Sequence, residues 1–190
     1  GLSQDYVERS NLRIEIMRFT KELLRDQRRT TGRLDSRYTG IDRDAAGEHF
    51  EFDASYAAAQ GAYSATFNDY VRRELGFASD LPYEILTGLY KTWSFSEHEN
   101  RFVNVAETLR KAMSINPFLK VHVANGYFDL ATPYSAANYT VNHLSLDPGL
   151  RANISASYYE AGHMMYAHRP SLLKLKSELA RFIDQATPGG

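Results

Sequence analysis

The chain has 190 residues, of which 43% are hydrophobic and 24% charged, and these values are typical of one compact domain or two small ones. A formal net charge of -1 gives no electrostatic basis for binding nucleic acid or an anionic membrane, and no stretch approaches the roughly 20 apolar residues of a membrane span. The absence of cysteine excludes a disulfide framework and a cysteine-ligated metal. We therefore expect neither a nucleic-acid partner nor a membrane partner.

The first 115 residues are expected to be mainly helical. Apolar residues at helix spacing predict a helix over residues 12–23, with charged residues on its other face. A polar loop without strand-like alternation then runs to about residue 53. Further helices are predicted, in chain order, over residues 54–75, 82–90 and 103–114. Asn116-Pro117 ends this helical part, because proline disfavours helix in the residue before it.

Two possible binding patterns in this region are weak. Arginines cluster around the polar loop, but aspartates alternate with them, which indicates a solvated and internally paired surface rather than an anion site. The residues concerned are Arg25, Arg28, Arg29, Arg33 and Arg37 with Asp26, Asp35, Asp42 and Asp44. The histidines lack carboxylate partners at metal-ligand spacing, so no metal site is predicted.

Two short apolar runs after residue 116 predict strands that end in turns. The first covers residues 119–124 and the second covers residues 154–159, just before Gly162-His163. Thr132-Pro133 predicts the start of a helix between the strands, with Thr132 as the N-cap. The predicted unit is therefore strand, turn, helix, strand, turn and helix.

Each of the two turns carries one side chain suited to acid–base chemistry. Asp129 follows the first predicted strand and His163 follows the second, which is the second half of the Ser…Asp…His order of α/β-hydrolases. A serine nucleophile needs a neutral histidine to take its proton and a carboxylate to orient that histidine. The sequence contains no Gly-x-Ser-x-Gly segment, and Ser79 lies outside any strand-to-helix pattern. By spacing alone, such residues are more often a packed or surface histidine and a turn-forming aspartate.

The residues themselves resemble a known family. Asn125–Pro133 and Tyr158–Tyr166 are similar to the Asp and His boxes of the serine carboxypeptidases, peptidase family S10, in their bacterial branch. Gly32–Gly40 and Asn116-Pro117 also resemble that branch. The resemblance covers nearly the whole chain but matches only the C-terminal part of a family member. The absence of cysteine agrees with a bacterial source, for which a periplasmic, secreted or cytoplasmic location stays open.

The resemblance implies an α/β fold that is the C-terminal part of an α/β-hydrolase. Residues 1–115 would form a mostly helical cap segment. Residues 116–190 would form a core segment with the last two strands and helices, carrying the Asp and the His. His163 would be the general base of a Ser-Asp-His triad and Asp129 its orienting partner. Met164 would face the pocket for the C-terminal side chain of the substrate, and Glu160 is a second candidate substrate-binding residue.

The implied activity is the release of C-terminal residues from peptides, without a cofactor. The nucleophile would lie in a missing N-terminal half, so the 190 residues alone are expected to be inactive. Two strands of a parallel sheet leave bare edges, and we therefore expect the chain to bind its missing half or to self-associate. Two alternatives stay open: an esterase or acyltransferase with the same triad, or a noncatalytic helical interaction module.

Overall fold

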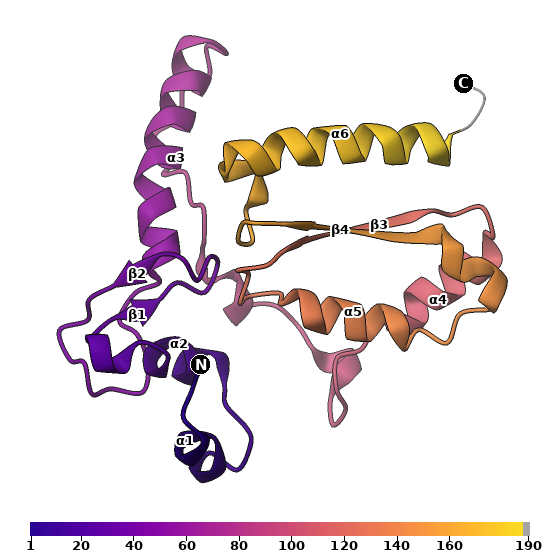
Figure 1. Ribbon diagram of the computed structural model, residues 1–190. Helices are drawn as coiled ribbons and strands as arrows, with labels where there is room; N and C mark the ends of the chain where they lie inside the picture. The colour runs from indigo at the N-terminus through magenta and orange to yellow at the C-terminus, as the bar shows by residue number, and fades with distance from the viewer. Residues whose placement is uncertain (188–190) are drawn as a thin grey trace. The chain divides into compact units, whose positions relative to one another are not determined.

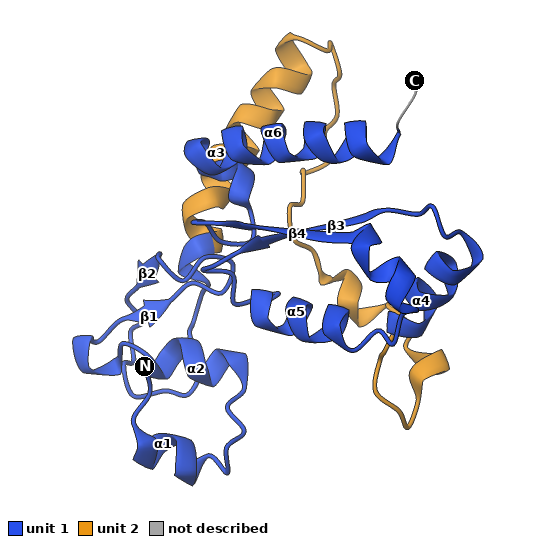
Figure 2. Cartoon of the chain, turned by 45° about the vertical axis from the view of Figure 1, so that its right-hand side comes forward, with its two compact units in different colours: residues 1–55, 105–190 blue, residues 56–104 orange. Residues whose placement is uncertain are grey.

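The structure is a computed structural model that describes residues 1–187. The helices are α1 Gln4–Arg9, α2 Ile16–Glu22, α3 Ala54–Arg73, α4 Ala106–Ile115, α5 Tyr134–Asn142 and α6 Arg169–Ala186, and the strands are β1 Thr30–Thr31, β2 Thr39–Gly40, β3 Val121–Gly126 and β4 Ile154–Tyr159 (Figure 1). The chain divides into two compact units, one that joins residues 1–55 with those from 105 onward and one of residues 56–104 (Figure 2). The mixed α/β class is confirmed, whereas the α/β-hydrolase fold stays a prediction.

The larger unit is built on a parallel pair of strands. β3 and β4 run in register from Val121↔Ile154 to Gly126↔Tyr159, and α5 lies in the connection between them. Helix α6 covers one face of this pair, and α4 and α5 cover the other (Figure 1). The predicted order of strand, turn, helix, strand, turn and helix is therefore confirmed. Both turns follow the carboxyl ends of the strands and so lie at the same edge of the sheet.

The face toward α4 and α5 carries the apolar core of this unit. Met113, Leu144 and Leu146 are buried there, and Val121 and Ile154 from the two strands pack against them. Full burial of a side chain of this size stabilises the fold by about 1.5–3 kcal/mol. Helix α4, expected in the cap segment, contributes Met113 to this core, so the compact units do not divide at residue 115. The roles of residues 1–115 as cap and 116–190 as core stay a prediction.

The face toward α6 is held by a chain of polar contacts. The two ring nitrogens of His122 each lie 2.8 Å from a serine hydroxyl, Nδ1 from Ser155 and Nε2 from Ser157. The Ser157 hydroxyl lies 2.7 Å from the hydroxyl of Tyr159, which donates to Glu178 of α6 at 2.6 Å. Burial, and then the neighbouring Glu178 carboxylate, raise the pKa of Tyr159 to about 12. Helix α6 is therefore fixed to β4 by hydrogen bonds as well as by packing.

The N-terminal segment differs from the predicted helix over residues 12–23. Asn11 and Leu12 adopt left-handed backbone conformations, with φ of 51° and 60°, and separate α1 from α2. Glu15 then begins α2, because its side chain accepts hydrogen bonds from the backbone N–H groups of Met17 and Arg18. The short antiparallel pair β1–β2 lies inside the expected polar loop. The prediction of a helix that begins at residue 12 was therefore wrong, because Leu12 belongs to the turn before α2 although its spacing fits the apolar face of that helix.

The smaller unit is dominated by α3. The predicted helix over residues 54–75 is confirmed to within two residues, whereas residues 82–90 form only a 3₁₀ turn at Gly88–Lys91. Within this unit the ring of Phe67 packs on that of Tyr83, with 4.3 Å between centroids. Large apolar side chains nevertheless remain exposed, including Leu81, Tyr90, Trp93 and Phe102.

Candidate active site

Asp129 lies in a tight turn at the end of β3. Its side chain is buried, with 5% of its surface exposed. The Oδ1 atom accepts hydrogen bonds from the backbone N–H groups of Ala131 and Thr132, at 2.8 and 2.9 Å. The Oδ2 atom accepts one from the Thr132 hydroxyl at 2.7 Å. These three donors fix the carboxylate and favour its charged form.

His163 is brought to the second oxygen of this carboxylate. Its Nδ1 lies 2.8 Å from Asp129 Oδ2 and 3.2 Å from the Thr132 hydroxyl oxygen. Since the Thr132 hydroxyl donates its proton to Asp129, its oxygen is left to accept from Nδ1. The network therefore assigns the proton to Nδ1 and leaves the lone pair on Nε2. Within residues 1–187, no hydrogen bond occupies Nε2, and the side chain is 45% exposed.

The pKa of Asp129 reflects two opposing effects. Burial raises the pKa of Asp129, but the hydrogen bonds from the side chain and backbone of Thr132, followed by that from His163, lower it more. The net result is a pKa below the ordinary aspartate value, so the group is ionised at neutral pH. An ionised Asp129 can stabilise a positive charge on His163.

The two predicted substrate-binding residues, Glu160 and Met164, flank His163 in the sequence and differ in how far they are exposed. Glu160 follows β4 directly and is exposed, and its backbone carbonyl accepts a hydrogen bond from Arg37 at 2.8 Å. Met164 is half-buried and precedes the short 3₁₀ helix Met165–Ala167. Their substrate-binding roles stay predictions.

Thr132 is a site residue that the sequence analysis assigned to a different role. It was expected to be the N-cap of α5, but Pro133 holds that position and no side chain caps the helix. The Thr132 hydroxyl instead contacts Asp129 and His163. The correction has a physical reason: the Thr132 hydroxyl donates to the Asp129 carboxylate and its oxygen faces His163 Nδ1, so that oxygen does not accept the backbone N–H groups at the start of α5. The Asp-x-x-Thr spacing was the only local signal for this contact.

Asp35 and Arg37 are further residues that the sequence analysis missed at this site. They were interpreted as part of a solvated surface, and they do form an ion pair, with Arg37 Nη2 2.6 Å from Asp35 Oδ2. Asp35 also accepts a hydrogen bond from the backbone N–H of Gly162 at 3.0 Å. The pair therefore contacts the turn that carries His163. Only the family resemblance of residues 32–40 pointed to this loop.

Glycine is required at the end of β3 and in the turn before His163, because backbones approach closely at both positions. A Cβ atom on Gly126 would lie 2.3 Å from the carbonyl oxygen of Gly162 and 2.5 Å from that of Ala161. A Cβ atom on Gly162 would lie 2.3 Å from the carbonyl oxygen of Leu34 and 2.4 Å from Cβ of Asp35. Residue 162 must therefore be glycine because the neighbouring loop leaves no room for a Cβ atom.

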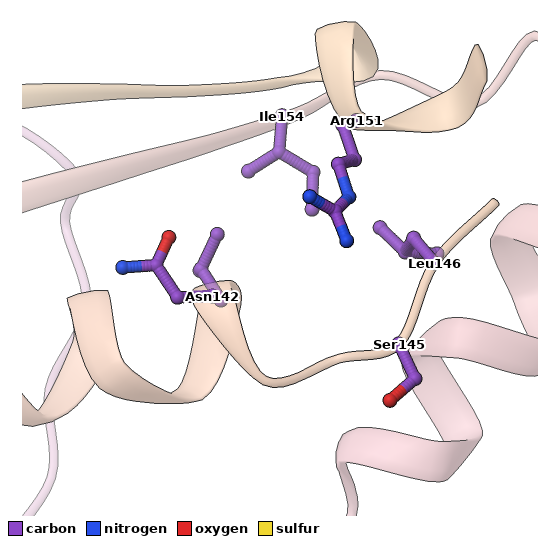
Figure 3. Close-up of a pocket in the computed structure, with 6 residues that line it drawn as sticks. Asn142, Ser145, Leu146, Arg151 and Ile154 are labelled. Atoms are coloured by element: carbon purple, nitrogen blue, oxygen red, sulfur yellow. The ribbon is translucent and has the colours of Figure 1, made fainter. Parts of the chain in front are cut away.

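A cavity of about 220 Å³ lies at the opposite end of the sheet (Figure 3). Its walls come from α5, the following loop and the start of β4, namely Val141, Asn142, Ser145, Leu146, Arg151 and Ile154. Ile154 begins β4 and His163 follows its end, so the length of the strand, roughly 16 Å, separates them. The cavity is therefore not part of the site around Asp129 and His163.

The described part of the chain, residues 1–187, contains no group of three or more His, Cys, Asp or Glu side chains placed to hold a metal ion. Among the helices of these residues, none is long and apolar enough to cross a membrane. Comparison with protein-family models, with curated proteins and with solved structures gives no match for this chain. The geometry around Asp129 and His163 therefore carries the functional interpretation.

Proposed function

We propose that this chain supplies the base and the orienting carboxylate of a serine-type carboxypeptidase, whose nucleophilic serine lies in polypeptide outside these 190 residues. One observation carries the proposal: Nδ1 of His163 lies 2.8 Å from Asp129 Oδ2, and Thr132 fixes the tautomer that leaves Nε2 free. This is the arrangement a general base needs in order to accept a proton from a hydroxyl group.

The proposed reaction uses these two residues in both halves of an acyl transfer. The serine oxygen attacks the last peptide carbonyl while Nε2 of His163 takes the hydroxyl proton. The C–N bond then breaks, and the imidazolium returns that proton to the departing amine. Water attacks the acyl-enzyme in the same way, which releases the shortened peptide and restores the serine. Asp129 stays ionised throughout and stabilises the imidazolium.

The test begins with the reading frame upstream of the codon for Leu2, followed by expression of the longest continuous protein. We expect it to release the C-terminal amino acid from N-acylated dipeptides. His163→Ala and Asp129→Asn are expected to lower kcat/KM by about 10³–10⁴-fold, as loss of a triad member does. The matched control is Asp147→Asn, because Asp147 also accepts a backbone hydrogen bond in a turn but lies before β4.

The possible outcomes separate the proposed activity from its alternatives. Full activity in the His163→Ala variant would overturn the catalytic role of this pair. Hydrolysis of esters without hydrolysis of peptides would assign the same pair to an esterase or acyltransferase. A native start codon at this position, with no partner protein that supplies a serine, would indicate a noncatalytic interaction module.

A further inference from the structure

The loop of residues 32–38 lies between the two turns of the candidate site. On one side, Ser36 donates its backbone N–H to the carbonyl of Phe128 at 2.9 Å. On the other side, the N–H of His163 donates to the carbonyl of Leu34 at 2.7 Å. The loop therefore forms backbone hydrogen bonds to the residue before Asp129 and to His163 itself, although Ser36 and Phe128 are 92 positions apart in the sequence and Leu34 and His163 are 129 apart.

Arg37 connects the same two turns through its side chain. Its Nη1 atom donates to the carbonyl of Glu160 at 2.8 Å, just before the His163 turn. Its guanidinium carbon lies 5.0 Å from the ring centroid of Phe128, next to Asp129. One planar cation thus contacts both turns, which is a geometry that Arg provides and Lys does not.

Asp35 fixes the orientation of Arg37 and holds the His163 turn directly. Its two oxygens accept from Nε of Arg37 at 3.0 Å and from Nη2 at 2.6 Å, which is a bidentate pair. Oδ2 also accepts the backbone N–H of Gly162 at 3.0 Å. The Asp35 side chain is 14% exposed and that of Arg37 37%, so the pair is partly shielded from water.

We propose that Asp35 and Arg37 are a positioning pair that holds the His163 turn against Asp129. Neither side chain contacts His163 Nδ1 or Asp129, so neither is a catalytic residue. The pair acts through the backbone of residues 160–162 and through the ring of Phe128. This inference rests on the proposed function, since it concerns how the base of that reaction is kept in register with its carboxylate.

The consequence is measurable on His163 without any enzyme assay. When His163 is held on Asp129, its proton sits on Nδ1; when it is released into water, the Nε2–H form of a neutral imidazole becomes populated. Loss of the Arg37 hydrogen bonds is expected to raise the ratio of Nε2–H to Nδ1–H about tenfold, the change that follows from one lost charged hydrogen bond. Nitrogen-15 NMR of the imidazole distinguishes the two forms.

The experiment uses the full 190-residue chain with labelled histidine, at about pH 8.5. We compare wild type with Arg37→Ala, which removes all contacts, and Arg37→Lys, which keeps the charge but not the bidentate geometry. Arg43→Ala is the matched control, because Arg43 also pairs with a carboxylate, that of Glu51, but is 91% exposed. An increase in Nε2–H in both Arg37 variants and not in Arg43→Ala is the expected result.

Two other results have separate meanings. A wild-type His163 whose proton is not on Nδ1 would overturn the proposed function itself. A wild-type His163 held on Asp129, with an unchanged spectrum in folded Arg37 variants, would overturn the positioning role alone. If circular dichroism shows that Arg37→Ala is unfolded, Arg37→Lys decides by the same criterion, supported by Asp35→Asn.

Discussion

Thr132 determines which nitrogen of His163 carries the proton. A carboxylate next to an imidazole attracts the Nδ1 proton but does not by itself fix the ring in one position. The Thr132 hydroxyl donates to Asp129 and accepts from His163, so a second contact favours the same tautomer and the same ring orientation. The three side chains therefore form a closed set of hydrogen bonds, and such networks are more sensitive to the loss of one member than isolated contacts are.

Thr132→Val tests this set, because valine keeps the shape of threonine and removes the hydroxyl. We expect the pKa of Asp129 to rise toward its ordinary value, since a hydrogen bond to the charged form is lost. We also expect the free energy of unfolding at pH 7 to fall by about 1 kcal/mol. Carbon-13 NMR of the carboxyl group and urea unfolding measure the two quantities. Thr140→Val on the exposed side of α5 is the control.

The pH dependence of this effect has a definite sign. The pKa of Asp129 is lowered in the folded state, so its contribution to stability is present above the ordinary aspartate value of about 4. That contribution is lost as the pH falls through the lowered pKa. The difference in stability between wild type and Thr132→Val is therefore expected to vanish on acidification. A difference that persists at a pH where carbon-13 NMR shows the Asp129 carboxyl to be protonated would contradict the assignment to Asp129.

At the scale of elements, the close contact between the His163 turn and the 32–38 loop explains why residue 162 is glycine. Gly162→Ala would place a Cβ atom 2.3 Å from a backbone oxygen, which the loop can relieve only by moving. We expect a loss of about 1–3 kcal/mol in the free energy of unfolding. Gly61→Ala in α3 is the control, because nothing lies within 4 Å of the new atom and alanine favours helix. An equal effect in both variants would contradict the contact.

The attachment of α6 to the sheet gives a prediction at alkaline pH. The pKa of Tyr159 is about 12, above its ordinary value, so its stabilising effect is present below about pH 10 and is lost as the pH rises through 12. Tyr159→Phe is expected to cost about 1–2 kcal/mol at neutral pH, because Glu178 and Ser157 lose a partner. The difference in the free energy of unfolding between wild type and Tyr159→Phe, measured by urea unfolding, should decrease between pH 10 and 12. Tyr139→Phe, at an exposed tyrosine, should show neither effect.

Local patterns predicted those elements whose residues interact within a few positions. The strand over 154–159 has the predicted bounds. The first strand begins and ends two residues later than predicted, because its pairing with the parallel partner starts at Val121 and continues through Asn125 and Gly126. The contacts of Asp35 and Arg37 could not be predicted in this way. Their hydrogen-bond partners Glu160 and Gly162 lie more than 120 residues away in the sequence, and only folding brings them together.

For the whole molecule, the unusual feature is a two-stranded parallel sheet covered by helices on both faces. Within the described residues, no third strand pairs with β3 or β4. The outward carbonyl of Tyr158 on β4 accepts a hydrogen bond from Lys174 of α6, which covers that edge in part. Tyr127, which directly follows β3, donates its backbone N–H to the carbonyl of Tyr159 on β4, so by alternation the backbone groups of Ala124 on β3 face away from β4. The β3 edge is therefore the more open of the two.

An open strand edge binds other strands, and we expect the isolated chain to self-associate through β3 or to bind another polypeptide segment that adds a strand there. Sedimentation or light scattering over a range of concentrations measures this. Ala124→Lys should weaken the association, because a charged side chain on an edge strand opposes pairing. Ala58→Lys adds the same charge to exposed α3 and is the control. Equal weakening in both variants would mean that association depends on the overall charge and on exposed apolar surface, not on the β3 edge. A chain that stays strictly monomeric at high concentration would contradict the expectation altogether.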